Sequence, residues 1–187
     1  MMSATHLAHH FLLAMPALKN PHFFHALIYI CEHDDDGTMG IVLNRITEYR
    51  VGELFGQLGI RDADKNTKER LLLAGGPMQA ERGFILHRPS GDWEASLTVQ
   101  DDVTLTSSRD ILEVIAQGKG PAENIIALGY AGWSPGQLEQ EIADSAWLTM
   151  PADSDMIFNT PPDKLWQSAA HAMGVDLNLL SSQTGHA

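Results

Sequence analysis

A short apolar run that leads into a glycine-rich pentapeptide constrains the fold of this chain more than any other feature. Residues 124–128 are apolar enough for a buried strand, and Gly129-Tyr130-Ala131-Gly132-Trp133 follows directly. The small residues of the pentapeptide allow a close backbone approach or a positive φ. A helix is predicted immediately afterwards, with Ser134 as the N-cap, Pro135 at the first helical position and Gln137 completing a capping box. The segment therefore predicts a buried strand that ends in a tight turn at a helix N-terminus.

Nine further strands are predicted from short apolar runs that are rich in β-forming residues and bounded by turn residues. They cover residues 11–15, 26–31, 40–44, 71–74, 83–87, 96–99, 103–105, 147–148 and 156–158. Asp34-Asp35-Asp36-Gly37 predicts a β-hairpin between the second and third of these strands. The break Gly75-Gly76-Pro77 separates the fourth from the fifth, and Asp101-Asp102 predicts a turn between the sixth and seventh.

Helices are predicted where apolar residues recur at helical spacing. The first covers residues 51–58 and ends at Gly59, and a second is capped by Ser107 and ends at Gly118. A final helix is capped by Thr160 and contains Leu165, Trp166, Ala169 and Met173. The charged residues 61–70 are predicted to form a surface loop, and the last ten residues to be loosely held.

The length and the apolar content of the chain are those of one α+β domain. A chain of 187 residues with 44% hydrophobic residues can build a sizeable core without disulfides or metal ions. No internal repeat, low-complexity linker or shift in composition divides the chain. We therefore predict a single domain over residues 1–187, with a core at about 11–170 and two flexible termini.

The charge of the chain counts against direct binding to nucleic acid. Twelve basic and 24 acidic side chains give a net charge of −12, so the average surface field repels a phosphate backbone. The densest basic residues are Lys65, Lys68 and Arg70, and no run of Lys or Arg resembles a stripe that follows a groove.

The predicted location is the cytoplasm. Cys31 is the single cysteine, which suits a reducing compartment because no internal disulfide can form. The N-terminal residues lack the basic and apolar regions of a signal peptide. No apolar stretch approaches the roughly 18 residues that a transmembrane helix needs, and no membrane association is predicted.

Several ordered motifs resemble those of the AlgH/YqgE family. They are Gly75-Gly76-Pro77, Leu86-His87, Gly129-Tyr130-Ala131-Gly132-Trp133, Gly136-Gln137-Leu138-Glu139 and Trp147-Leu148, preceded by Ala14-Met15-Pro16 and residues 40–45. The resemblance runs from about Phe11 to Trp166, and motifs in a fixed order are far more specific than any one of them.

The resemblance implies a compact α+β fold with a mixed, bifurcated β-sheet curled into a pseudo-barrel with flanking helices. It also implies a bacterial cytoplasmic protein of an uncharacterised group, and no activity comes with the family name. Some members carry the label of transcriptional regulator. The net charge of −12 and the lack of a recognisable helix-turn-helix pattern count against that role here.

Common catalytic and cofactor signatures are absent from the chain. It contains no Gly-x-Ser-x-Gly elbow, no Walker A pattern and no Gly-x-Gly-x-x-Gly after a strand, and no cofactor is predicted. The histidines lack the spacing of a zinc site, and the loop after Glu32 lacks the glutamate that an EF-hand needs at its twelfth position, so no metal is predicted.

Two places at strand ends carry candidate polar groups. Asn44 and Arg45 could bind a carboxylate or phosphate, although a turn-capping Asn beside a surface Arg is an equal alternative. His87 could act as a general base or bind an anion with Arg88, and a histidine satisfied by the local backbone is the favoured alternative.

The pentapeptide and the following helix form the third candidate site. Backbone N–H groups at the helix N-terminus would favour an anion near Gly129, and Tyr130 and Trp133 could line a pocket there. Gln137, Glu139 and Glu141 on the helix could add polar groups. The alternative, which we favour, is that both aromatic side chains fill the core and the carboxylates face solvent.

These features support three functional hypotheses, which we give in order of preference. The first is a non-enzymatic regulatory protein that binds an unknown small ligand or protein partner around Gly129. The second is an enzyme of unrecognised type that uses His87 with Glu139 or Glu141 as acid and base. The third is a transcriptional regulator.

Overall fold

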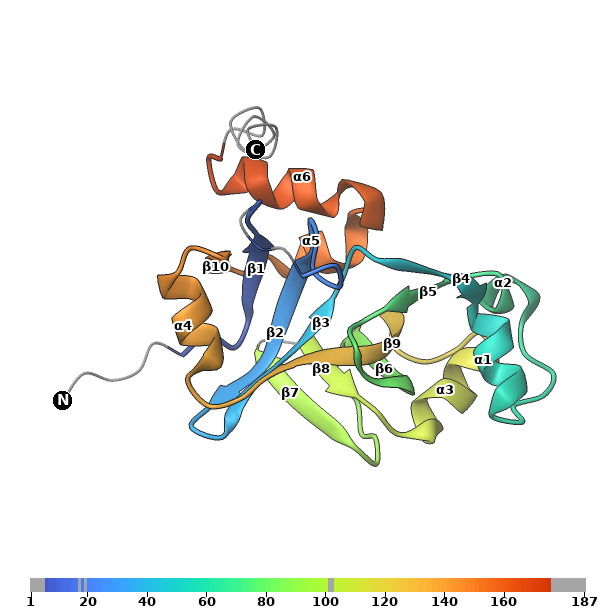
Figure 1. Ribbon diagram of the computed structural model, residues 1–187. Coiled ribbons are helices and arrows are strands. Elements are labelled where there is room, and N and C mark those ends of the chain that lie inside the picture. Colours follow the sequence, from blue (N-terminus) through green and yellow to red (C-terminus); the bar gives the residue numbers. More distant parts are fainter. Residues whose placement is uncertain (1–5, 17, 19, 101–102, 176–187) are drawn as a thin grey trace.

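A computed structural model describes residues 6–16, 18, 20–100 and 103–175 of the chain (Figure 1). Its strands are β1 (His10–Ala14), β2 (Leu27–Asp34), β3 (Gly37–Val42), β4 (Ile46–Arg50), β5 (Leu71–Ala74), β6 (Met78–Arg88), β7 (Ser96–Gln100), β8 (Val103–Thr106), β9 (Glu123–Trp133) and β10 (Trp147–Pro151). Its helices are α1 (Val51–Gln57), α2 (Lys65–Lys68), α3 (Arg109–Ala116), α4 (Gln137–Ala143), α5 (Ser154–Asn159) and α6 (Pro162–Ala172).

The strands form one mixed sheet that branches at β9. The main order is β10-β1-β2-β3-β9-β6-β8-β7, and a side branch adds β5 and then β4 to β9. The pairing of β5 with β9 is parallel, whereas the other pairs are antiparallel. The sheet is not closed. The predicted α+β class with a mixed, bifurcated sheet and flanking helices is confirmed.

The branch point explains the glycines of the pentapeptide. The first half of β9 pairs with β5 and β6, and its second half pairs with β3 through Ala131 opposite Gly40. Gly129 stands between the halves with φ +76°, and its buried Cα faces the backbone of Gly76 so closely that a Cβ would overlap the carbonyl oxygen. The N–H of Gly75 donates to the carbonyl oxygen of Leu128 at 2.7 Å. Two glycine motifs that lie far apart in the sequence thus pack against each other.

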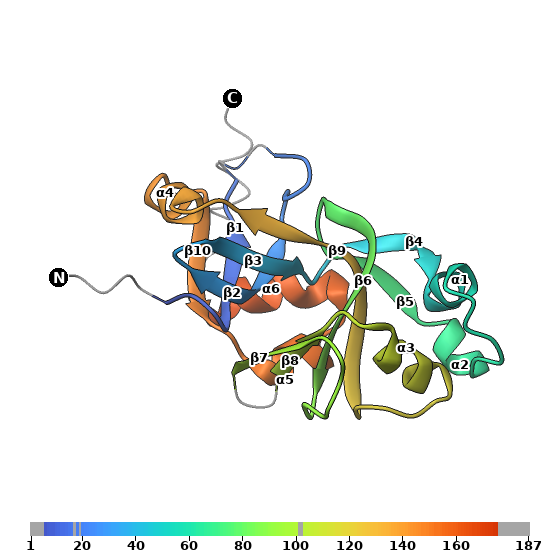
Figure 2. The same ribbon diagram turned by 90° about the horizontal axis from the view of Figure 1, so that it is seen from below.

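Three buried clusters fill the space around the branched sheet. One lies between α6, α5 and one face of β1, β2 and β3, and a second lies on the opposite face against Trp133, Leu138 and Trp147. The third packs α1 and α3 against β5, β6 and β9. Figures 1 and 2 show α1, α2 and α3 together at one end of the molecule, with α4 and β10 at the other.

The prediction that the strand ends before Gly129 is wrong, because β9 continues to Trp133. The following helix begins at Gln137 rather than after Ser134, and its N-cap is Gly136 with φ +79°. Half of the predicted capping box is nevertheless present, since the Ser134 N–H donates to Gln137 Oε1 at 3.0 Å. The pentapeptide is therefore part of a sheet and does not stand at a helix N-terminus.

The predicted strand at residues 156–158 is wrong, because these residues belong to helix α5. The Asp153 carboxylate caps this helix by accepting from the backbone N–H groups of Asp155 and Met156. Only Ile157 is buried along α5, and a run of three apolar residues suits one turn of helix as well as a strand. The predicted loop at 61–70 also contains α2, whose N-cap is Asp64.

Smaller differences concern the helix caps. The N-cap of α3 is Ser108 instead of Ser107, and that of α6 is Pro161 instead of Thr160. The predicted turn at residues 101–102, the flexible N-terminus up to residue 5 and the loosely held last ten residues lie outside the described residues. No described helix is long and apolar enough to cross a membrane.

Candidate functional site

A hollow of about 510 Å³ lies between the β2–β3 hairpin, the second half of β9 and the start of α4. Three of the predicted site residues line it, namely Tyr130, Trp133 and Gln137. The remaining walls come mostly from the hairpin and from the first residue of β6. These lining residues are Glu32, Asp34, Asp36, Gly37, Thr38, Met39, Met78, Gly132 and Ser134.

The hollow combines carboxylates with soft apolar groups. Glu32, Asp34 and Asp36 are exposed, and an Asp34 oxygen accepts the Asp36 backbone N–H at 2.8 Å, which shapes the hairpin turn. Met78 is 47% exposed, although large apolar side chains are usually buried. The ring of Tyr130 is held edge-on against Phe84, with 5.5 Å between the ring centroids. Negative charge on one wall and an aromatic and thioether surface on another are the features that bind organic cations.

Trp133 contributes more to the core beside the hollow than to its surface. The side chain is 5% exposed, stacks on Phe23 and meets Trp147 edge-on at 6.0 Å. One oxygen of Glu141 accepts both indole N–H groups, from Trp133 at 3.1 Å and from Trp147 at 3.0 Å. The other oxygen accepts the Gln137 amide at 3.0 Å. Glu141 therefore fastens α4 to β9 and β10, as buried indole N–H groups require a partner.

Glu139 is also engaged in a structural contact. Its carboxylate lies 2.7 Å from Nε2 of His33, a residue that is almost fully buried. The other ring nitrogen of His33 accepts the backbone N–H of Leu7 at 3.0 Å, so the proton of a neutral ring is assigned to Nε2, which donates to Glu139. This pair ties α4 to β2 and to the N-terminal segment.

His87 is 0% exposed and lies on β6, opposite Thr104 of β8. Its Nδ1 lies 3.0 Å from the carbonyl oxygen of Pro89, and its Nε2 lies 2.7 Å from the hydroxyl of Thr106. A carbonyl can only accept, so Nδ1 carries the proton and Nε2 accepts from Thr106. Burial lowers the pKa of His87, with the Pro89 hydrogen bond opposing the shift. The geometry matches the favoured alternative, a histidine satisfied by its local surroundings.

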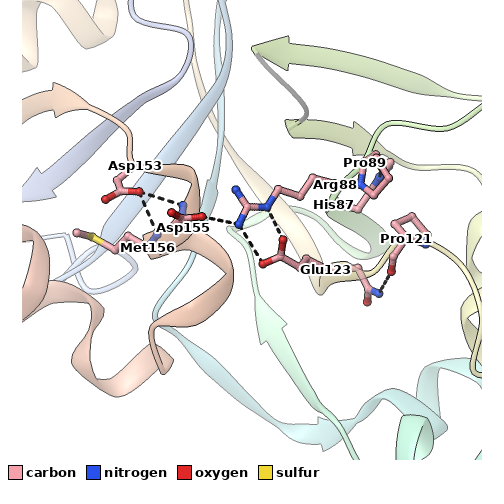
Figure 3. A network of polar contacts seen from close by, with 9 residues as sticks. His87, Arg88, Pro89, Pro121, Glu123, Asp153, Asp155 and Met156 are labelled. Atoms are coloured by element: carbon pink, nitrogen blue, oxygen red, sulfur yellow. Dashed lines mark hydrogen bonds and ion pairs between the residues drawn. The ribbon is translucent and has the colours of Figure 1, made fainter.

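Arg88, next in the chain, is the centre of an ion-pair network (Figure 3). Its Nε and Nη2 donate to the two oxygens of Glu123, its cross-strand neighbour, at 2.5 and 3.1 Å. Nη2 also donates to Asp155 on α5 at 2.6 Å, and the guanidinium lies over the ring of Phe158. These contacts raise the pKa of Arg88 further, first through the bond to Glu123. The arginine holds α5 against the sheet and does not form a site with His87.

Asn44 and Arg45 secure the loop before β2. The Asn44 side chain accepts the N–H of Leu27 at 2.9 Å and donates to the carbonyl oxygen of His25 at 2.8 Å. Arg45 donates to the carbonyl oxygen of Phe24 at 2.8 Å. Both side chains thus satisfy backbone groups, which is the capping alternative raised from the sequence.

The predicted site residues do not converge on one surface. Tyr130, Trp133 and Gln137 share the hollow, whereas Asn44, Arg45, His87, Gly129 and Glu141 are not among its lining residues. Sequence reasoning missed the acidic wall, although Glu32 and Asp34 alternate along one strand and therefore share a face. No group of three or more His, Cys, Asp or Glu side chains in the described residues is placed to hold a metal ion.

The fold and the hollow define a class: an α+β protein with a sheet branched at one shared strand and an acidic surface depression beside the branch. The family model described as AlgH-like matches residues 11–178. The chain belongs to the AlgH-like family. The predicted resemblance is confirmed, and the family is uncharacterised.

Similar proteins come from many bacteria. A UPF0301 protein of Thioalkalivibrio sulfidiphilus is 49% identical over 187 residues, and one of Nitrosococcus oceani is 48% identical, each alignment covering 100% of both chains. The solution structure of AlgH from Pseudomonas aeruginosa has a TM-score of 0.81 and 43% identity, covering 100% of this chain and 99% of that chain. A crystal structure from Corynebacterium diphtheriae, with 21% identity, a TM-score of 0.73 and coverage of 97% and 94%, supports the fold alone.

Proposed function

We propose that the protein is a non-enzymatic binding protein whose hollow receives a positively charged organic group. The group is an ammonium or a guanidinium, presented either by a small molecule or by a side chain of a protein partner. The observation that carries the proposal is the composition of the hollow, in which the three hairpin carboxylates face a space that Met39, Met78 and Tyr130 also line.

The electrostatics of the whole chain favour such a ligand. A net charge of −12 attracts cations over a distance, and a concave acidic surface concentrates them locally. Once inside, a cation gains from the face of an aromatic ring and from polarisable sulfur. Phe84 supports the Tyr130 ring edge-on, which reduces the ordering cost on binding.

The contacts of the residues that the enzyme hypothesis names favour a binding role over catalysis. The alternative enzyme hypothesis needs His87 with Glu139 or Glu141. His87 is buried with both ring nitrogens hydrogen-bonded, Glu139 contacts His33, and Glu141 holds two indoles. A regulatory effect would then arise from the bound ligand or partner, without chemistry at these residues.

Isothermal titration calorimetry at low salt tests the proposal with two probes. Spermidine represents a small cation, and a blocked peptide with two arginines represents a partner side chain. Removing two carboxylates with Glu32→Gln and Asp36→Asn is expected to weaken binding about 5- to 30-fold, since exposed charge pairs are worth roughly 0.5–1 kcal/mol each. The matched control, Glu48→Gln with Glu81→Gln, removes exposed carboxylates that do not line the hollow.

An equal loss of affinity in the two double variants would show that the probes bind outside the hollow. If neither probe binds wild-type protein at millimolar concentration, the proposal fails. Preference for spermidine identifies a small-molecule ligand, and preference for the peptide identifies a protein partner.

We also propose that the protein acts in the cytoplasm and without direct contact to DNA. Cys31 is the single cysteine, and it is buried, so the fold needs no oxidising compartment. Cell fractionation with an antibody checks the location. A gel shift at moderate salt checks the second part, and retardation of a promoter fragment by purified protein would restore the regulator hypothesis.

A further inference from the structure

Figures 1 and 2 show α2 and α3 at one end of the molecule. A second hollow, of about 220 Å³, lies beside these helices. It is formed by α2, by the turn after α3 and by the start of β9. Its lining residues are Thr67, Arg70, Ile115, Gly118, Lys119, Gly120, Pro121, Ala122 and Asn124. Its two charged lining side chains are both cations, although the chain as a whole is strongly acidic.

Arg70 is the central group of this hollow. Its side chain is partly buried, and its Nη2 donates to the backbone carbonyl oxygen of Asn124 at 2.7 Å. No ion pair within the described residues involves Arg70. Burial lowers the pKa of this arginine. A desolvated charge without a counter-charge is costly, so the site is completed best by an anion.

Two further groups define what the anion must offer. Lys119 lines the hollow with an exposed side chain and supplies a second positive charge. Asn124 lines it too, and its Oδ1 is a buried acceptor without a hydrogen-bond partner in the described part of the chain. Its amide nitrogen donates to the carbonyl oxygen of Pro121 at 3.1 Å. A ligand that suits the site therefore carries negative charge for the two cations, whereas Asn124 Oδ1 has almost no surface open to it.

The carboxylate of Asp64, beside the same turn, forms no ion pair with Arg70. It lies about 3.6 Å from the position that a Cβ on Gly118 would take. Its Oδ2 accepts both the backbone N–H and the hydroxyl of Thr67, at 3.0 and 3.1 Å, and so caps α2. The Asp64 carboxylate is thereby committed to the helix.

We propose that this hollow is a binding site for a phosphate group, either free or as the monoester of a small molecule. Arg70 supplies a planar fork for two phosphate oxygens, and Lys119 supplies a point charge. A phosphate carries more negative charge than a carboxylate and has three or more acceptor oxygens, enough for both cations at once. A volume of about 220 Å³ holds the group with a few further atoms and excludes a drug-sized ligand.

Phosphorus NMR and calorimetry with inorganic phosphate at constant ionic strength test the proposal. One site per chain is expected, with succinate bound more weakly than phosphate. Arg70→Gln is expected to weaken binding at least tenfold, and Lys119→Ala about three- to tenfold. Lys164→Ala, which removes an exposed lysine from α6, is expected to leave the affinity unchanged.

Lys119→Ala is the decisive variant because its exposed side chain makes no contact on which the fold depends. Equal affinities for Lys119→Ala and Lys164→Ala would overturn the site, as would the absence of phosphate binding at 20 mM. Phosphate is also expected to raise the melting temperature of the wild type more than that of Arg70→Gln. Comparing inorganic phosphate with glycerol 3-phosphate separates the free ion from a monoester. The result is independent of the cation site, since the two hollows share no lining residue.

Discussion

Replacing Gly129 by alanine is the sharpest test of the branch point. The residue is buried with φ +76°, where β9 passes from its pairing with β5 and β6 to its pairing with β3. A Cβ at this position would overlap the carbonyl oxygen of Gly76 and lie 2.9 Å from that of Met78. Both obstacles are backbone atoms of neighbouring segments, so no change of a side-chain rotamer can remove them.

The expected cost has two separable parts. The left-handed conformation costs an L-residue with a Cβ roughly 1–2 kcal/mol. Overlap in a packed interior adds about 1–3 kcal/mol, because the backbone itself must shift. The sum predicts that Gly129→Ala lowers the free energy of unfolding by about 2–5 kcal/mol, a large fraction of the total stability of a typical domain.

Gly59→Ala is the matched control, because Gly59 has φ +71° and a Cβ there would meet nothing within 4 Å. It pays only the conformational part, about 1–2 kcal/mol. Urea unfolding followed by tryptophan fluorescence measures both variants, since Trp133 and Trp147 are buried in the native state. If Gly129→Ala costs no more than Gly59→Ala, the steric account of the branch point is refuted.

Three further outcomes follow from the polar contacts. The pKa of His87 is lowered in the folded state, so this histidine binds a proton more readily in the unfolded chain. Stability should therefore be full above about pH 6.5 and decline below that pH, by at most about 1.4 kcal/mol per pH unit. Urea midpoints at several pH values should therefore show a flatter profile for His87→Gln. Glu141→Gln replaces a charged acceptor of two indole N–H groups by a neutral one, and a loss of about 1–2 kcal/mol with a changed near-ultraviolet circular dichroism spectrum is expected. Arg88→Lys loses the fork to Glu123, and because the ion pairs are partly exposed we expect a loss of only about 1 kcal/mol that shrinks as salt is added; a salt-independent loss would argue for packing instead.

The strands of the buried sheet were the most predictable part of the fold. Residues 26–31 and 71–74 are apolar and rich in β-forming residues, and the structure places β2 and β5 there. Residues 156–158 have the same apolar character but belong to a helix. Asp153 caps this helix, and Ile157 is its one buried residue. A run of three apolar residues is too short for its periodicity to distinguish the two.

The candidate site was less predictable because it depends on contacts between distant segments. The sequence singled out Tyr130 and Gln137, which do line the acidic hollow. It could not show that Gly129 packs on Gly76, a contact set by the register of β9 against its neighbours. The burial of Arg70 without a counter-charge is likewise invisible in a sequence where it is one basic residue among several.

The sharing of β9 between two branches also sets how the protein unfolds. If β9 leaves, the parts of the sheet are no longer joined, since β3, β5 and β6 all hydrogen-bond to that strand. The amide protons of β9 are therefore expected to exchange only through global opening, whereas those of the edge strands β4, β7 and β10 exchange through local fraying. Fragments of the chain that end on either side of β9 are therefore expected to lack independent order. They should recover that order only when β9 is supplied to both.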